Sequence, residues 1–538
     1  METENNNTNK NFLKGTLILT LSSIVVKVIG SLNWIFLSRV LGGEGIGLYQ
    51  MGFPIYLMAI TVSSAGIPVA ISIITSEKLA NKDYRGAKRV FNVSLRLLFI
   101  SGLIFSSALL FGAGWLTENH FIRDARAYYS IIALAPAVFF VTFLASFRGY
   151  LQGWQIMTPT AWSEVVEQIM RVITMLIFAD MFLPYGLAYA AGGASMGAGV
   201  GAFCALLVLC WFYARLKKRM QKEIEAQDDS APVEAAMHIV KRLLALALPV
   251  SLSSLMLPIG ANLDLLIVPQ RLEVAGFEIR HATELFGYLT GMAVPLVNLA
   301  TIFTAAMTIS LVPAISESRT LNAYDAIRDK IRIAFRVALI ITFPCFMGLF
   351  FLAEKVAALI YNAPLAASAI QSMSVGILFL GMHQISTGIL QGLGHTGIPV
   401  INMIIACVAK IVLSWILTAM PDLGIKGAAM ATVADFAVAA ILNMIFIYKY
   451  TAYKLSFGSI IRPAIASSIM GAVIYGVLLV TGKMGAWSIL FAMIASVPTY
   501  ALALMATGGL SREDLDNIPF VGRRLLALGQ RFGLFKDK

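Results

Sequence analysis

Charged residues are scarce in this chain. Only 13% of its 538 residues are Asp, Glu, Lys or Arg, whereas 58% are hydrophobic. A water-soluble domain carries about 25% charged residues to cover its surface, so this composition excludes an ordinary soluble protein. Apolar runs of roughly 20 residues, the length that crosses a bilayer as a helix, recur along the whole chain. Because the runs are continuous rather than short and alternating, they predict transmembrane helices and not barrel strands.

Cysteine and the motifs of common enzymes are also nearly absent. The four cysteines (Cys204, Cys210, Cys345 and Cys407) lie inside apolar runs and lack metal-ligand spacing, so they predict neither a disulfide nor a metal centre. No P-loop, H-E-x-x-H or C-x-x-C pattern occurs. The predicted outer loops are too short for a large external catalytic domain. We therefore expect no enzymatic activity, no cofactor and no direct use of ATP.

The net charge of +12 comes from basic residues in short linkers between the apolar runs. The positive-inside rule places such linkers in the cytoplasm. This distribution predicts a multi-pass protein of the cytoplasmic membrane with both termini inside, and it argues against nucleic acid as a partner. The linkers in question contain Lys78, Lys82, Arg85, Lys88 and Arg89; then Arg215, Lys217, Lys218, Arg219, Lys222, Lys241 and Arg242; then Arg319, Arg328, Lys330 and Arg332.

The predicted fold is an all-α integral membrane protein with about fourteen transmembrane helices. The polar N-terminus precedes an apolar run that is too long for a signal-peptide core, so we expect it to stay as the first helix. The predicted spans are 14–39, 46–75, 91–117, 127–150, 160–183, 186–213, 243–269, 284–316, 333–360, 367–390, 399–420, 424–449, 460–482 and 485–507.

An internal repeat predicts two lobes of six helices. LSSIVVKVIGSLNW at 21–34 aligns without gaps with LSSLMLPIGANLDL at 252–265, and the tripeptide LQG recurs at 151–153 and 390–392. Because six is an even number, the lobes would share one orientation and be related by a pseudo-two-fold axis along the membrane normal. The predicted parts are an N-lobe at 1–213, a cytoplasmic connector at 214–242, a C-lobe at 243–449, two further helices at 450–507, and a basic amphipathic tail at 508–538 whose helix covers 517–538.

Few ionisable residues lie inside the N-lobe spans, and each is a candidate for substrate binding because buried charge is costly. Lys27 lies near the middle of the first helix, where it would bind an anion or pair with a buried carboxylate. Glu164, Glu167 and Arg171 share one face of the fifth helix; they would line a transport pathway, or Glu167 and Arg171 would form a structural pair and leave Glu164 to another cation such as Lys27. Arg39 and Asn33 complete the N-lobe candidates.

The C-lobe candidates are acidic and amide groups. Asp264 and Asp435 could form a site for a coupling cation or proton, or one of them could form a structural bridge with Lys410. Asn402 is a further polar candidate in the same lobe. His383 is more typical of a satisfied core residue than of a proton relay.

The helix 1–2 region (27–80) and the helix 7–8 region (268–318) resemble the polysaccharide-export and flippase branch of the MOP (MATE-like) superfamily, in particular the stage V sporulation protein B and MurJ-type group. The resemblance covers nearly the whole chain. It implies two lobes around a central cationic cavity for a polyprenyl-pyrophosphate headgroup. The first-helix cation of the group falls on Lys27 in KVIG, and a later arginine falls on Arg39 in RVLG.

The resemblance also has departures. MurJ-type members often carry an arginine where this chain has Asn33, and further arginines in helices 2 and 8, where this chain has none. Some members hold sodium in the second lobe, and Asp264 and Asn402 match two of those ligands, but Ala406 stands where an acid would follow. The resemblance implies a flippase for an undecaprenyl-pyrophosphate-linked saccharide such as lipid II, with a coupling cation as a further partner; a monomer would suffice. The alternatives are a cation-coupled multidrug exporter and a membrane scaffold.

Overall fold

The computed structural model describes residues 2–64, 66–225, 227 and 234–509, and throughout these residues the secondary structure is helical. By its internal contacts the chain divides into two compact units. The first unit contains Met1–Glu273 and Phe277–Gly287, and the second contains Val274–Gly276 and Tyr288–Lys538. The predicted amphipathic helix at 517–538 lies outside the described residues.

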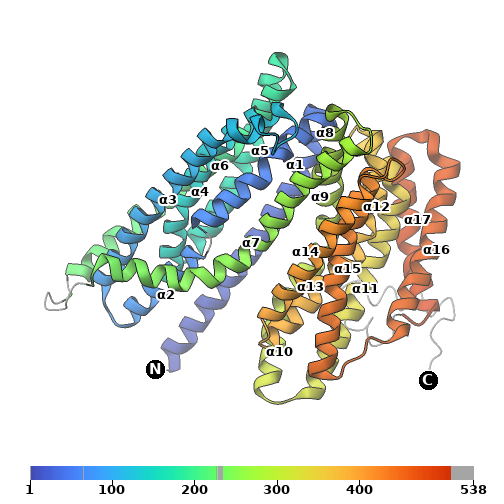
Figure 1. Cartoon of the computed structure of the whole chain (residues 1–538). Coiled ribbons are helices and arrows are strands. Elements are labelled where there is room, and N and C mark those ends of the chain that lie inside the picture. The colour runs from blue at the N-terminus through green and yellow to red at the C-terminus, as the bar shows by residue number, and fades with distance from the viewer. Residues whose placement is uncertain (1, 65, 226, 228–233, 510–538) are drawn as a thin grey trace. The chain divides into compact units, whose positions relative to one another are not determined.

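The first unit is built from long helices that run alongside one another, as Figure 1 shows for α3, α4 and α6. Its elements are α1 (Glu2–Ser64), α2 (Ile67–Ala80), α3 (Tyr84–Glu118), the 3₁₀ turn η1 (Ala125–Ala127), α4 (Tyr128–Gly153), α5 (Thr158–Phe182), the 3₁₀ turn η2 (Leu183–Tyr185), α6 (Leu187–Glu225), α7 (Ala236–Val274) and α8 (Ile279–Gly287).

The second unit is helical as well but has more breaks. Its elements are the π-helical turn η3 (Tyr288–Ala293), α9 (Val294–Ala300), α10 (Ile302–Thr320), α11 (Tyr324–Lys355), the π-helical turn η4 (Val356–Ile360), the 3₁₀ turn η5 (Pro364–Ala366), α12 (Ala367–Ser374), α13 (Gly376–Gly392), α14 (Gly397–Leu417), α15 (Ile425–Thr451), α16 (Phe457–Thr481), the 3₁₀ turn η6 (Gly482–Met484) and α17 (Ala486–Ala506).

A helix overlaps every predicted span. Within the described residues, nine helical stretches are long and apolar enough to cross a membrane, or up to eleven when each bent pair counts as one span. One of the nine, Ser22–Ala80, has 59 residues, which at 1.5 Å per residue is far more than the ~30 Å of one crossing. The chain is therefore an all-helical, multi-span membrane protein, and the count of fourteen stays a prediction.

The helix breaks differ in part from those predicted. The sequence predicted a boundary between the first two spans at 40–45. In the structure α1 continues through this segment with a kink at Gly42, whose φ of 64° is left-handed. A second break at Gly66, with φ of 76°, divides the predicted span 46–75 into two helices. Since only glycine adopts such angles without strain, both breaks are set locally by the sequence. The predicted span 284–316 bends by 50° between Ala300 and Ile302; a π-helical turn precedes Pro295, which has no N–H to donate.

The core of the first unit lies among α2, α3, α4, α6 and the start of α7. Buried Ile71, Phe91, Tyr150 and Leu243 belong to one hydrophobic cluster there. The Phe91 ring stacks on Tyr150 with 4.5 Å between ring centroids. By these contacts α7 belongs with the first unit, although the sequence prediction assigned 243–269 to the second lobe. The lobe boundaries stay a prediction.

Candidate functional site

A buried cluster of three charged groups joins α4 to α5. The Glu167 carboxylate accepts one hydrogen bond on each oxygen, from Arg148 Nη2 at 2.8 Å and from Arg171 Nη2 at 2.7 Å. Arg148 Nε also donates to Ser163 Oγ at 3.1 Å. The three charged side chains are only 13–18% exposed. Two cations on one carboxylate leave the trio with a net positive charge inside an apolar unit, which is the environment that attracts an anion.

Glycines of α6 bring that helix close to the backbone of α5. A Cβ placed on Gly197 would lie 2.8 Å from the Arg171 carbonyl oxygen, and one on Gly201 would lie 2.6 Å from the Glu167 carbonyl oxygen. Neither distance is possible for a real side chain. This spacing of small residues every four positions is typical of membrane helices in close contact. The sequence of α6 thus fixes the segment of α5 that carries the charged cluster.

The α1 candidates differ from one another in their surroundings. Asn33 is buried, and its Nδ2 donates to Met175 Sδ on α5 at 3.0 Å, while its Oδ1 has no hydrogen-bond partner among the described residues. Lys27 is exposed, and no ion pair to its ammonium is found in the described part of the chain. Arg39 is also exposed. The structure therefore brings Asn33 to α5 and leaves Lys27 and Arg39 on the surface of the unit.

Arg148 is the residue that sequence reasoning missed. The predicted bridge between Glu167 and Arg171 is present, but Arg148 makes it a three-membered cluster. Arg148 also attracts the carboxylate of Glu164, for which the sequence suggested Lys27 as a partner. The available signal was a single arginine near the end of an apolar run, and residues in that position usually extend to the lipid headgroups.

The second unit contains a buried chain of neutral polar groups. Asn402 Nδ2 donates to Asn443 Oδ1 at 2.8 Å, and Asn443 Nδ2 donates to Ser386 and Thr387 hydroxyl oxygens, each at 3.1 Å. This network joins α13, α14 and α15. Of its four members only Asn402 was a candidate from the sequence, because the other three are polar residues that membrane helices tolerate.

The antiparallel pairing of α14 with α15 places Lys410 level with Asp435. Asn402 contacts Asn443, so moving eight residues forward on α14 and eight back on α15 leads from this pair to Lys410 and Asp435. Lys410 is 7% exposed. Asp264 belongs to the first unit and not to the unit that holds Asn402. In the described ranges no group of three His, Cys, Asp or Glu residues is arranged to hold a metal ion.

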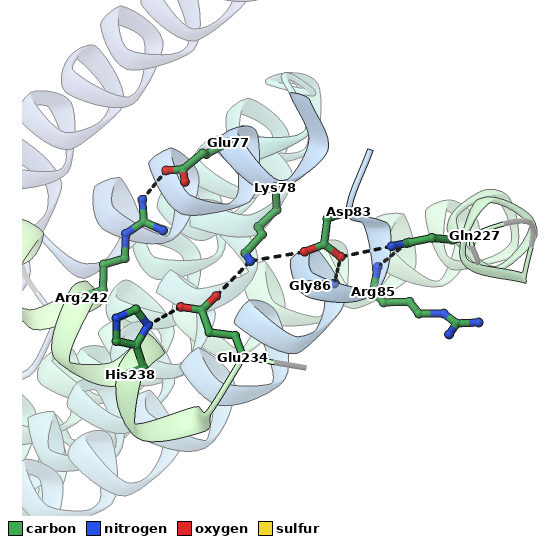
Figure 2. A network of polar contacts seen from close by, with 9 residues as sticks. All are labelled: Glu77, Lys78, Asp83, Arg85, Gly86, Gln227, Glu234, His238 and Arg242. Atoms are coloured by element: carbon green, nitrogen blue, oxygen red, sulfur yellow. Dashed lines mark hydrogen bonds and ion pairs between the residues drawn. The ribbon is translucent and has the colours of Figure 1, made fainter. Parts of the chain in front are cut away.

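A polar network ties the connector between α6 and α7 to the loop between α2 and α3 (Figure 2). Lys78 Nζ lies 3.3 Å from Asp83 Oδ2 and 2.9 Å from Glu234 Oε2. Gln227 Nε2 donates to Asp83 Oδ1 at 3.3 Å, and Arg242 pairs with Glu77. We call these six residues the connector network. Two linkers predicted to share the cytoplasmic face therefore do lie together.

The carboxyl groups of the connector network are held in their charged form. Hydrogen bonds from Lys78 and His238 lower the pKa of Glu234. Burial acts to raise the pKa of Asp83, but hydrogen bonds from the Gly86 N–H, Gln227 and Lys78 outweigh it and leave that pKa below its usual value.

A second network, near the other end of α3, joins α1, the turn η1 and α8. Arg126 Nη1 lies 2.6 Å from Glu44 Oε1, Arg126 Nη2 lies 2.7 Å from Asp124 Oδ2, and Thr283 Oγ1 donates to the same Asp124 oxygen at 2.9 Å. Burial acts to raise the pKa of Asp124, but the bonds from Arg126 and Thr283 lower it. These residues come from linkers predicted to face outward. The linkers predicted for the two sides of the membrane therefore form two separate clusters.

One short match to a hydrolase pattern has no catalytic geometry. Residues 193–197 read GASMG, which fits G-x-S-x-G. Ser195 is fully buried within α6 and donates to the Ala191 carbonyl oxygen at 3.0 Å. A nucleophile elbow needs an exposed serine on a strand-to-helix turn, so this serine belongs to helix packing.

Solved membrane transporters share the fold of this chain. Solved structures with this fold include an inward-facing multidrug resistance MATE family transporter of the MOP superfamily (17% identical, TM-score 0.67, covering 81% of this chain and 98% of that one). Another is the lipid II flippase MurJ in an inward closed conformation (17% identical, TM-score 0.65, covering 90% and 98%). At such identities the likeness shows the fold alone, which is that of a MOP superfamily membrane transporter.

Sequence comparison gives the family. Residues 12–319 match the family described as polysaccharide biosynthesis protein, and residues 289–416 match MatE. Stage V sporulation protein B of Bacillus subtilis is 30% identical over 96% of this chain and 99% of its own. Lipid II flippase MurJ of the same organism is 25% identical over 85% and 87%. The chain belongs to the polysaccharide biosynthesis protein family of the MOP superfamily. Because the members of that family are transporters, this protein is a transporter and not an enzyme.

Proposed function

We propose that this protein is a flippase that moves a polyprenyl-pyrophosphate-linked glycan precursor from the inner to the outer leaflet of the cytoplasmic membrane by alternating access, and that its substrate is the peptidoglycan precursor lipid II. The names of its relatives support the proposal. One full-length relative is called a lipid II flippase and another a stage V sporulation protein.

The observation that carries the proposal is the charge of α1. Its exposed Lys27 and Arg39 face away from the packed interior of the unit, and the sequence has no Asp or Glu from residue 5 to residue 43. A pathway lined by cations without acids on the same helix favours a pyrophosphate group, which forms charge-assisted hydrogen bonds with Lys and Arg. Asn33 would bind a sugar hydroxyl through the Oδ1 that has no partner in the described residues. The lipid tail would stay in the bilayer.

The charged cluster on α5 would respond to the same anion. Glu167 forms an ion pair with both Arg148 and Arg171 in the structure. An arriving pyrophosphate would compete with Glu167 for these arginines, with Glu164 as a second carboxylate on the same face. Such competition gives the substrate different contacts in two conformations, which is what a ligand needs to shift a conformational equilibrium.

The second unit would supply the coupling cation site. The amide oxygens of Asn402 and Asn443 and the hydroxyl oxygens of Ser386 and Thr387 are suitable sodium ligands. Asp435 and Lys410 are the charged groups of the same unit that would tune the site.

The competing function is a cation-coupled multidrug exporter, since the fold occurs in MATE transporters too. An exporter of cationic drugs would favour acids over cations on α1. The test is depletion of the protein, followed by analysis of lipid-linked intermediates and of their accessibility from outside the cell. After depletion, inward-facing lipid II should accumulate. It should disappear again when an unrelated lipid II flippase is expressed. Normal lipid II together with loss of another surface polysaccharide would disprove the substrate but keep the flippase.

A further inference from the structure

An apolar groove of about 500 Å³ lies on the first unit, between the start of α5 and the middle of α6. Nearer the start of α6, Gly197 and Gly201 hold that helix against the backbone of α5. Beyond Gly201 the lining residues carry large side chains, so the groove begins where this close contact ends. Six apolar or aromatic residues line it: Trp162, Val166, Leu207, Val208, Trp211 and Phe212.

Two tryptophans suit the groove to the boundary between acyl chains and lipid headgroups. Trp162 is 56% exposed and Trp211 is 50% exposed. Within the described ranges neither indole N–H has a hydrogen-bond partner. An indole ring has an apolar body and one N–H donor, which is why tryptophan is enriched at the membrane interface. The groove can therefore hold an acyl chain and donate hydrogen bonds to the polar atoms next to that chain.

A cation stands at one end of the groove. The Arg215 guanidinium carbon lies 3.9 Å from the centroid of the Trp211 ring, which is a cation–π contact. This contact leaves most of the five N–H donors of the guanidinium group for a ligand. Among the described residues no carboxylate pairs with Arg215, and exposed Lys218 follows one turn later. The apolar groove therefore ends at a positive charge.

The groove is separate from both the charged cluster and the connector. Glu164 lies two residues from Trp162 and two from Val166, which is about 200° around α5, so the groove lies on the face opposite to that carboxylate. Toward the connector, α6 continues for ten residues beyond Arg215 to Glu225, which is about 15 Å along the helix axis. The groove therefore faces the surrounding membrane, away from the side on which the cluster would meet a transported headgroup.

We propose that this groove binds an anionic phospholipid of the surrounding membrane. One acyl chain lies along Trp162, Leu207 and Trp211, and Arg215 binds the phosphate group, since a guanidinium fork matches phosphate oxygen atoms. The charge of Arg215 and Lys218 selects an anionic headgroup over a neutral one. In the topology predicted for this chain the lipid belongs to the inner leaflet. The proposal does not depend on which substrate is transported.

The test uses the purified full-length protein in detergent, with native mass spectrometry to count bound lipids. The probes are phosphatidylglycerol, phosphatidylcholine and undecaprenyl phosphate. Arg215→Gln is compared with Lys217→Gln, which removes the same charge from an exposed position on another face of α6. We expect Arg215→Gln to bind phosphatidylglycerol about tenfold more weakly, as loss of a charge-assisted contact implies, while its binding of phosphatidylcholine is unchanged. Lys217→Gln should match the unmodified protein.

A second pair of variants tests the acyl chain. Trp162→Ala/Trp211→Ala removes both aromatic walls and should weaken the binding of phosphatidylglycerol and phosphatidylcholine alike, each severalfold. Trp487→Ala, which alters a tryptophan that is 63% exposed in the second unit, is the control. If the double variant does not fold, Trp162→Ala alone should show the same loss to a smaller degree.

Three results would overturn the proposal. Equal losses of phosphatidylglycerol in Arg215→Gln and Lys217→Gln would show general electrostatic attraction. Unchanged binding by the tryptophan variants would show that no acyl chain lies in the groove. Displacement of phosphatidylglycerol by undecaprenyl phosphate at lower concentration would assign the groove to a polyprenyl lipid and not to a phospholipid.

Discussion

Variants of single residues in α1 distinguish the proposed flippase function from the exporter function, and Lys27 is the most informative of these residues. Its ammonium group is exposed in the structure, so its removal leaves no buried partner behind. A contact between an ammonium and a phosphate contributes about 1.5–3 kcal/mol, so Lys27→Ala should lower flipping about tenfold or more while the melting temperature is unchanged. Lys27→Arg should keep most of the activity. The measurement is transport of labelled lipid II into the outer leaflet of proteoliposomes, with exposed Lys222→Ala as the matched control. Normal transport by Lys27→Ala would exclude a role in binding.

The charged cluster makes a prediction about the order of three variants. Removal of Glu167 leaves Arg171 without its carboxylate partner and Arg148 with only the carboxylate of Glu164 nearby, whereas removal of either arginine leaves Glu167 paired with the other. Breaking a buried ion pair costs about 3–5 kcal/mol, so Glu167→Ala should lower the melting temperature clearly more than Arg148→Ala or Arg171→Ala.

Comparing transport with stability in a double variant of the same cluster tests its role in transport. In the double variant Glu167→Gln/Arg171→Ala, the amide oxygen introduced at position 167 can still accept a hydrogen bond from Arg148, so stability should recover in part. If transport recovers along with stability, the cluster is a structural bridge. Recovery of stability without transport supports the proposed competition between Glu167 and the substrate.

Among the elements, the segment between α6 and α7 has a pH dependence of its own. The pKa values of Asp83 and Glu234 are lowered in the folded protein. Their contribution is therefore complete above their unfolded pKa values of about 4 and is lost as the pH falls further. Glu234→Gln imitates the protonated state at neutral pH, and we expect it to speed proteolytic cleavage of the connector severalfold. Glu225→Gln, which alters an exposed pair with Gln221, is the control. Equal cleavage of the two variants would show that the connector network does not restrain the segment.

At the scale of the whole molecule, the two polar networks of the first unit predict the topology. The connector network joins one set of linkers, and the Asp124 network joins the other set at the opposite end of α3. Reporter fusions after residues 82, 228 and 325 should therefore report the cytoplasm, and fusions after 122 and 276 the outside. A cytoplasmic signal at 276 would contradict both the fourteen-span count and the orientation.

The sequence predicted helices well because long apolar runs have only one stable backbone arrangement in a bilayer. The breaks at Gly42 and Gly66 are local as well, since they depend on glycine. The pair Glu167–Arg171 was predictable from its spacing on one helix. Arg148 was not, because its partner lies 19 residues away on another helix.

The sequence by itself determined the membrane environment, the all-helical class and the alternation of polar linkers, since each depends on residues near one another in the chain. Only the tertiary structure decided which polar groups meet. Asn402 and Asn443 come from different elements of the chain, and so do Arg126 and Glu44. The physical reason is that apolar helices fit together through the shapes of their surfaces, as at Gly197 and Gly201. The helix pairs that this packing selects determine where each isolated polar side chain finds a partner.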